Sequence, residues 1–280
     1  MSTFPPKPNA IESIFGVKKA IIGMVHSLPM PGSPMFKKYT LDQVYEFGVQ
    51  EALRLKKGGA DGIMLENAWD LPFAKPEELG PETSSALAVL GWEIKRTTGM
   101  PLGINILANG AMASMATAKA CKADFIRVNQ WANAYVANEG FMEGKSGQVM
   151  RYRSWLEAEN IKVFADVHVK HGAHAIVADR SLAEQARDSE FFDADVLIAT
   201  GQRTGDATPV SEVKGIQEAV TLPVIIGSGL TVENCRSIMS VADGAVVGSY
   251  IKDDGVWWKP VDISRLQALM KEVHEVRKTN

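Results

Sequence analysis

The chain has 280 residues, of which 46% are hydrophobic and 22% charged, and its formal net charge at pH 7 is −3. These values are typical of a soluble globular protein and exclude the basic surface of a nucleic-acid-binding protein. No apolar run approaches the ~20 residues of a membrane-spanning helix. We therefore expect neither a nucleic-acid partner nor an integral membrane segment.

The N-terminus and the cysteines indicate the cellular compartment. Residues 1–9 are rich in proline and lack the apolar stretch of a signal peptide. Only Cys121 and Cys235 are present, and neither belongs to a CxxC motif or to a cluster of metal ligands. We expect a cytoplasmic protein without disulfide bonds or structural zinc, with an irregular N-terminal segment at about residues 1–18.

Short apolar runs alternate with helical patterns along the whole chain. The helical patterns cover residues 41–57, 83–98, 112–121, 149–159, 181–188, 210–220 and 263–277. The apolar runs, which predict buried strands, cover residues 20–26, 62–67, 102–107, 125–129, 163–168, 196–200, 224–229 and 244–249.

Eight predicted strands, each followed by a helical or helix-like segment, predict a closed barrel. Parallel strands need crossover connections, and no GxGxxG motif follows the first strand as it does in an open dinucleotide-binding sheet. The length is near the ~250 residues that a (β/α)8 barrel typically needs. The sequence therefore predicts α/β architecture, with a single (β/α)8 TIM barrel domain over residues 1–280. We expect the long loops after strands 1, 2, 4 and 5 to form lids on one face.

The last two strands end in small residues, which are Gly227, Ser228 and Gly229 in one and Gly248 and Ser249 in the other. Without a Cβ, backbone N–H groups can approach an anion closely. Many (β/α)8 barrels bind phosphate after strands 7 and 8. These residues are therefore candidate phosphate ligands, and the alternative is that the glycines only permit tight turns.

Polar side chains occur at nearly every strand end, where such barrels build their active sites. Polar groups inside apolar strands are costly to bury without partners, so packing alone explains them poorly. This pattern indicates an enzyme. The residues are His26, Glu66, Asn67, Asn105, Arg127, Asn129, Asp166, His168, Lys170 and Thr200.

Glu66 is the best candidate general base, because it shares a strand face with Met64 and burial would raise its pKa. The alternative is a salt bridge with Arg127. His26 belongs to the candidate site as part of the same set, although a lone histidine at a strand end is often only a hydrogen-bonded core group.

Asp166 and His168 lie two residues apart on one strand and so share a face. They could bind a divalent metal or share acid–base work with Glu66. The alternative is that Asp166 only orients His168 or caps a loop. Lys170 is a candidate Schiff-base nucleophile if it is desolvated, and otherwise a solvated loop lysine.

The remaining candidates would contact the substrate. Asn67, Asn105 and Asn129, with Arg127, suit a polyhydroxylated ligand. Residues 200–205, which include Thr200, Gly201, Arg203 and Thr204, predict a lid over the ligand or an exposed turn. Residues 257–258, both tryptophan, more often serve packing or a subunit contact than a substrate platform. Barrels of this kind often self-associate, so a homo-oligomer is one expectation.

The same stretches are similar to the BtpA/SgcQ family of predicted barrel proteins. The resemblance implies a ribulose-phosphate-binding type of barrel with an unassigned reaction, and a family named from photosystem I biogenesis and a sugar-operon context. It rests on residues 22–26 with the loop 28–32, on 59–62 leading to 66–67, and on 103–107, 125–129, 165–171, 200–201 and the two glycine-ended strands.

Two functions follow. The first is a cytoplasmic enzyme acting on a phosphorylated sugar or nucleoside-like metabolite, with isomerisation, aldol-type cleavage and glycosidic-bond hydrolysis all open. No cofactor is required by the sequence, and a divalent metal is one option. The second, implied by the family name, is a non-catalytic biogenesis or stability factor for a membrane complex.

Overall fold

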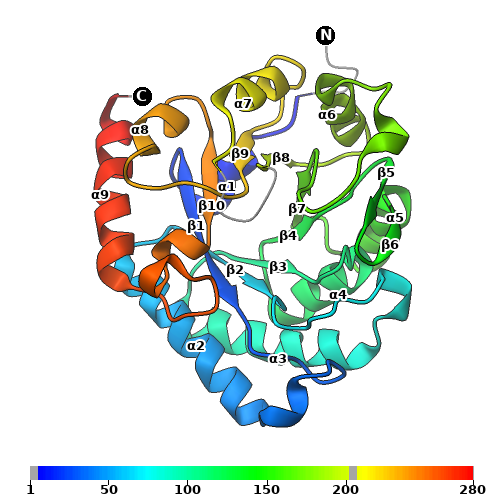
Figure 1. The fold of residues 1–280 in the computed structure, drawn as a ribbon, viewed down its shortest axis with the longest axis vertical. Coiled ribbons are helices and arrows are strands. Elements are labelled where there is room, and N and C mark those ends of the chain that lie inside the picture. The colour runs from blue at the N-terminus through cyan, green and yellow to red at the C-terminus, as the bar shows by residue number, and fades with distance from the viewer. Residues whose placement is uncertain (1–5, 202–206, 280) are drawn as a thin grey trace.

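Parallel strands form a closed barrel at the centre of the molecule, as the sequence predicts (Figure 1). The computed structural model describes residues 6–201 and 207–279. The strands pair in the order β1-β10-β9-β8-β7-β4-β3-β2. Their bounds are β1 (Ala20–His26), β2 (Gly62–Glu66), β3 (Leu102–Asn105), β4 (Phe125–Val128), β7 (Lys162–Asp166), β8 (Val196–Ala199), β9 (Val224–Ile226) and β10 (Gly244–Val247).

Helices surround the barrel. Seven of them begin and end within a few residues of their predicted bounds, whereas the helix Cys235–Met239 had no predicted bounds. The Thr40 side chain caps the first of them in a capping box with Gln43, and Gly59 ends it in the left-handed conformation. The helices are α2 (Leu41–Gly58), α3 (Pro81–Thr98), α4 (Ala111–Cys121), α5 (Ser146–Trp155), α6 (Leu182–Phe191), α7 (Val210–Gln217), α8 (Cys235–Met239) and α9 (Ile263–Thr279).

The expectation of an irregular N-terminal segment is wrong for six residues. Asn9 caps a short helix, α1 (Ala10–Phe15), whose Ala10 and Ile11 are buried. They pack with the lumen-facing side chains of the barrel strands, and the Phe15 ring meets the Phe125 ring edge-on with centroids 5.8 Å apart. The helix therefore plugs the barrel at the end away from the strand carboxyl termini.

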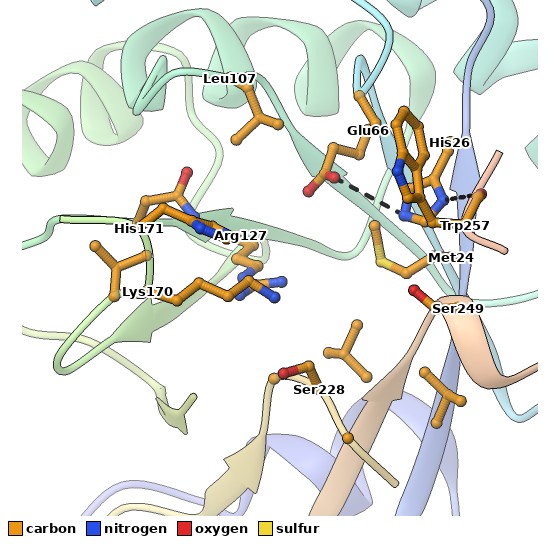
Figure 2. A pocket seen from close by; sticks show the side chains of 18 of the residues that line it. Met24, His26, Glu66, Leu107, Arg127, Lys170, His171, Ser228, Ser249 and Trp257 are labelled. Atoms are coloured by element: carbon orange, nitrogen blue, oxygen red, sulfur yellow. Dashed lines mark hydrogen bonds and ion pairs between the residues drawn. The ribbon is translucent and has the colours of Figure 1, made fainter. Parts of the chain in front are cut away.

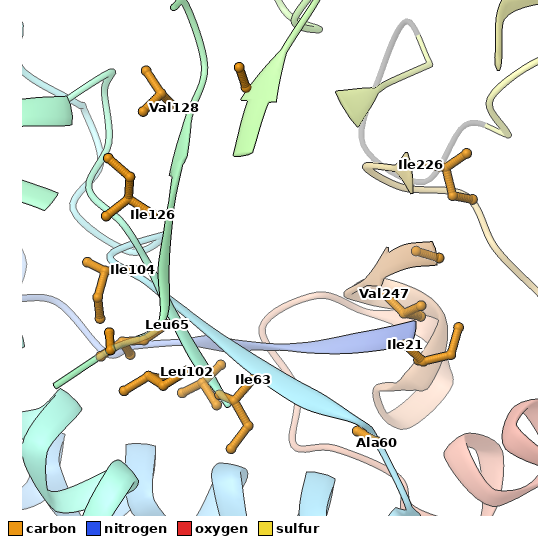
Figure 3. Close-up of a cluster of buried hydrophobic side chains, with 14 of the residues drawn as sticks. Ile21, Ala60, Ile63, Leu65, Leu102, Ile104, Ile126, Val128, Ile226 and Val247 are labelled. Atoms are coloured by element: carbon orange, nitrogen blue, oxygen red, sulfur yellow. The ribbon is translucent and has the colours of Figure 1, made fainter. Parts of the chain in front are cut away.

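Two hydrophobic layers follow from the alternation of side chains along each strand. Outward-facing residues such as Ile63, Leu65 and Ile104 pack against the helices (Figure 3). Inward-facing residues such as Met64 and Phe125 fill the lumen. The polar side chains at the carboxyl ends of the strands continue the inward-facing rows, so they lie directly above this lumen core.

The long connection after β4 contains a hairpin, β5 (Ala134–Ala137) and β6 (Gly140–Glu143), where the sequence predicted only a loop. Val136 and Ala173 exchange two backbone hydrogen bonds, which join the hairpin to the β7–α6 loop. The hairpin and the β7–α6 loop therefore form one continuous wall.

Two further features concern the cysteines and the helices of the described residues. Both cysteines are buried and free, so they form no disulfide bond. Within the described ranges, no helix combines the length and apolar character needed to cross a membrane.

Candidate functional site

A cavity of about 560 Å³ opens at the carboxyl ends of the barrel strands. It brings together many of the predicted site residues, which come from β1, β2, β4, β9, β10 and the β7–α6 loop. These residues are His26, Glu66, Arg127, Asn129, Lys170, Gly227, Ser228, Gly229, Gly248 and Ser249 (Figure 2).

Strand register lines up three polar side chains on one side of the cavity. His26 is the register partner of Glu66, and Glu66 is the register partner of Asn105. The Asn105 side-chain amide donates to Glu66 Oε2 at 2.6 Å, and His26 Nε2 lies 4.0 Å from Glu66 Oε1. Asn105 itself is buried and fixes the orientation of the carboxyl group.

His26 is neutral at physiological pH. Burial, followed by the nearby charge of Lys252, lowers the pKa of His26 to about 3. Its Nδ1 lies 3.0 Å from the Trp257 carbonyl oxygen, which only accepts hydrogen bonds. Nδ1 therefore carries the proton, and Nε2 presents its lone pair toward Glu66 (Figure 2).

Glu66 holds a proton at higher pH than an exposed glutamate. Burial raises the pKa of Glu66, while Arg127 and the hydrogen bond from Asn105 oppose the rise. The predicted alternative was a salt bridge between Glu66 and Arg127. The hydrogen-bonded ion pair of Arg127 is instead with Asp166, so Glu66 can change its protonation state without breaking an ion pair.

Asp166, at the end of β7, holds two residues that line the cavity on the side opposite His26. Its two oxygens accept from Arg127 Nε and Nη2 at 3.1 and 3.0 Å, and Asn129 Nδ2 donates to it at 3.1 Å. Asp166 is 2% exposed and is not among the described residues that line the cavity. It is therefore a positioning residue for Arg127 and Asn129, both of which do line the cavity.

The glycine-ended strands form the third side. Gly229 has φ +78°, a conformation that L side chains rarely adopt, and Gly248 follows β10 at the start of a short 3₁₀ turn. A Cβ on Gly248 would lie 3.3 Å from the His26 ring, so the backbone approaches the histidine closely. Figure 2 shows Ser228 and Ser249 on this side of the pocket.

Several lining residues were missed by sequence reasoning. Arg265, in the first turn of α9, lines the cavity, and its Nε donates to the Tyr250 carbonyl oxygen at 2.7 Å. Trp257 also lines it and was expected to serve packing or a subunit contact. Tyr135, on the hairpin, is a third. Its phenol has a raised pKa because it is buried and close to Glu139. None of the three stands at the end of a barrel strand, so the rule that placed the other candidates gave no signal for them.

Some predicted residues lie away from the described lining of the cavity. Asn67 is fully buried, and its amide atoms bond Asp70 and the backbone of Leu107. The Thr200 hydroxyl donates to the His168 carbonyl oxygen at 3.1 Å, and Gly201 is buried beside it. Arg203 and Thr204 lie outside the described residues.

The predicted metal pair does not come together as one group facing the cavity. The His168 ring lies against His174 with centroids 3.7 Å apart, whereas Asp166 holds Arg127. Burial and His174 lower the pKa of His168. Among the residues that the structure describes, no three His, Cys, Asp or Glu side chains are grouped so that they could hold a metal ion.

Several solved structures with the same fold carry the names of enzymes. Thiamine phosphate pyrophosphorylase from Pyrococcus furiosus aligns over 96% of this chain and 99% of its own, with TM-score 0.56 and 18% identity. N-(5′-phosphoribosyl)anthranilate isomerase from the same organism covers 92% and 99%, with TM-score 0.55 and 12% identity. Tryptophan synthase from Mycobacterium tuberculosis covers 95% and 96%, with TM-score 0.59 and 16% identity. At these identities the likeness shows the fold alone.

Sequence relatives are similar along almost the whole chain. An uncharacterized protein from Archaeoglobus fulgidus is 40% identical over 255 residues, which are 91% of this chain and 98% of that protein. The photosystem I biogenesis protein BtpA from Synechocystis is 32% identical over 263 residues, or 93% and 90% of the two chains. The BtpA family profile matches residues 17–275. This chain therefore belongs to the BtpA family.

Proposed function

We propose that this protein is an enzyme that binds the phosphate of a small metabolite beside β9 and β10 and transfers a proton with Glu66. The observation that carries the proposal is that one cavity contains both parts. Gly229, Gly248 and Ser249 line one side of it, and the protonatable carboxyl group of Glu66 lines another.

The phosphate end combines small residues with a cation. The absence of side chains at Gly229 and Gly248 allows backbone groups to come close to an anion. Arg265 supplies a guanidinium group, which suits the geometry of phosphate oxygens. Its Nε is held by Tyr250 O, and its guanidinium carbon lies 4.9 Å from the centroid of the Tyr250 ring. This bracing reduces the freedom that the arginine would lose on binding a ligand.

The reacting end has a carboxyl group and a neutral imidazole. A raised pKa brings Glu66 closer to the pH at which a general acid or base works best. The bare Nε2 of His26 accepts a hydrogen bond, while Trp257 O fixes its tautomer. Lys170 also lines this cavity and adds positive charge where an anionic intermediate would form.

Proton transfer is common to the reaction classes that the sequence left open. Isomerisation, aldol-type cleavage and glycosidic-bond hydrolysis all need a group that takes or gives a proton near the sugar. Asn129 is more than nine-tenths buried, and its Oδ1 has no partner among the described residues. A substrate hydroxyl could donate to this oxygen. The fold neighbours that are named after thiamine phosphate and phosphoribosyl compounds support a phosphorylated substrate.

Replacing Arg265 with glutamine is expected to weaken binding of phosphorylated ligands by roughly 10- to 100-fold, because one charged hydrogen bond contributes about 1.5–3 kcal/mol. The measurement is a thermal-shift screen of sugar phosphates and nucleotides, followed by calorimetric titration of each compound that raises the melting temperature.

Arg236→Gln is the matched control, since Arg236 is exposed, pairs with Glu272 and is not among the described residues lining the cavity. Equal affinities in wild type and both variants would contradict the phosphate assignment. A screen in which no phosphorylated compound raises the melting temperature of the wild type would contradict it as well.

The name of the Synechocystis relative favours a second candidate, a non-catalytic factor in photosystem I biogenesis. A scaffold role predicts that Glu66→Gln supports the cellular function as well as the wild type does. Catalysis predicts that this variant fails to complement a deletion strain.

A further inference from the structure

We infer that the substrate carries a flat, largely apolar ring in addition to its phosphate, as nucleoside 5′-monophosphates do. The inference rests on the proposed function, because it assumes that the phosphate binds beside β9 and β10. It adds that the opposite wall of the same cavity binds the ring.

Barrel topology places two chemically different walls across from each other. In the circular order of strands, β3 lies opposite β9 and β4 lies opposite β10. A ligand held by its phosphate at β9 and β10 therefore points toward the segments that follow β3 and β4. Between the two walls lie Glu66, the last residue of β2, and Arg127 on β4.

The wall opposite the phosphate end is apolar. The segment after β3 contributes Leu107 and Ala108, and the hairpin after β4 contributes Tyr135 and Ala137. Neighbouring loops add Leu71, Phe73 and Val169. A sugar phosphate alone has hydroxyl groups over most of its surface and would leave this wall in contact with water. A ring would cover it and bury apolar area.

The apolar wall is preformed. Ala108, Tyr135, Met142 and Val169 form a buried cluster of their own, separate from the two cores of the barrel. The Tyr135 ring stacks on His174 with centroids 5.2 Å apart and an interplanar angle of 12°. A rigid flat surface of this kind favours a planar ligand group, since little freedom is lost on binding.

Polar groups at the hairpin turn complement the edge of a nitrogen-containing ring. Asn138 and Glu139 occupy the turn between β5 and β6 and both line the cavity. The Glu139 carboxylate accepts hydrogen bonds, so it suits an exocyclic amino or ring N–H group, and the Asn138 amide can both donate and accept. An apolar face with hydrogen-bonding edges is the surface that a nucleobase presents.

The test compares ribose 5-phosphate with AMP, GMP, CMP and UMP by calorimetric titration into the full chain. We expect at least one nucleotide to bind tenfold or more tightly than ribose 5-phosphate. Leu71→Ala and Phe73→Ala should each weaken that nucleotide at least threefold and leave ribose 5-phosphate within twofold. Leu71 is 41% exposed, so its truncation is compatible with folding.

Phe141→Ala is the matched control. Phe141 lies on the same hairpin, is 43% exposed and is not among the described residues lining the cavity, so its loss should change neither affinity. The inference is overturned if ribose 5-phosphate binds as tightly as every nucleotide. It is also overturned if the nucleotide still binds tenfold more tightly than ribose 5-phosphate in both Leu71→Ala and Phe73→Ala. Failure of all five compounds and of inorganic phosphate would instead overturn the phosphate site, and this inference with it.

Discussion

Replacing Glu51 with alanine is expected to lower the free energy of unfolding by about 3–5 kcal/mol, because the change leaves a buried lysine without its ion-pair partner. Lys252 is 1% exposed, and its Nζ lies 2.7 Å from Glu51 Oε2. The Glu51 carboxylate also accepts from the backbone N–H of Val261. Glu51 therefore ties α2 to both ends of the loop 252–261, which contains Trp257 and so the partner of His26.

Chemical denaturation measures this loss directly, and the melting temperature should fall by roughly 6–20 °C. Glu272→Ala removes the matching residue of an exposed ion pair, with Arg236, and should cost no more than about 1 kcal/mol. Replacing both Glu51 and Lys252 by apolar residues should restore part of the stability. A loss below about 1 kcal/mol for Glu51→Ala would show that the pair does not hold this loop.

Glu66→Gln is expected to reduce turnover by about 10²- to 10⁴-fold, the usual contribution of a general acid or base. Glutamine keeps the shape of the side chain and still accepts the hydrogen bond from Asn105. The loss should therefore fall on kcat more than on KM, as measured with the first substrate that the ligand screen yields. A variant that turns over at the wild-type rate would exclude Glu66 from the proton transfer.

The same substitution should stabilise the protein, and the gain should grow with pH. The folded-state pKa of Glu66 lies above its unfolded value, so the folded state binds the proton more tightly than the unfolded state does. Wild-type stability is therefore lost as pH rises through the folded-state pKa, whereas glutamine has no such loss.

Thermal unfolding of both proteins from pH 4 to pH 8 gives this comparison. The pKa of His26 also differs from its ordinary value, but both proteins share His26, so its contribution cancels in the difference. The melting temperature of Glu66→Gln should exceed that of the wild type more at pH 8 than at pH 4. A difference that is constant with pH would contradict the raised pKa.

The barrel and the polar side chains that face its lumen could be predicted, because both follow from local periodicity in the sequence. Met64 and Glu66 are two residues apart on a strand, so the prediction that they share a face needed no tertiary information. The same rule separates Asn67 from the site, since it follows Glu66 directly and points the other way. Sequence reasoning grouped Asn67 with Glu66 because both stand at the strand end. It did not apply the rule that successive side chains of a strand point to opposite faces.

The missed residues depend on contacts that join distant segments. Arg265 belongs to the last helix, and its hydrogen bond to the Tyr250 carbonyl oxygen, fifteen residues earlier, holds it at the cavity. The hairpin β5–β6 covers the site through the bridge between Val136 and Ala173, which lie in different loops. Helix α1 is short and follows a proline-rich stretch, and packing against the open end of the barrel stabilises it more than local propensity does. None of these contacts has a signal in a single window of sequence.

The central claim is tested most directly by a crystal structure of the chain grown with saturating inorganic phosphate. The account predicts a tetrahedral anion within hydrogen-bonding distance of the backbone N–H groups at Gly229, Gly248 and Ser249 and of the Arg265 guanidinium. An anion bound only elsewhere, or a cavity that contains only water at saturating phosphate, would contradict it.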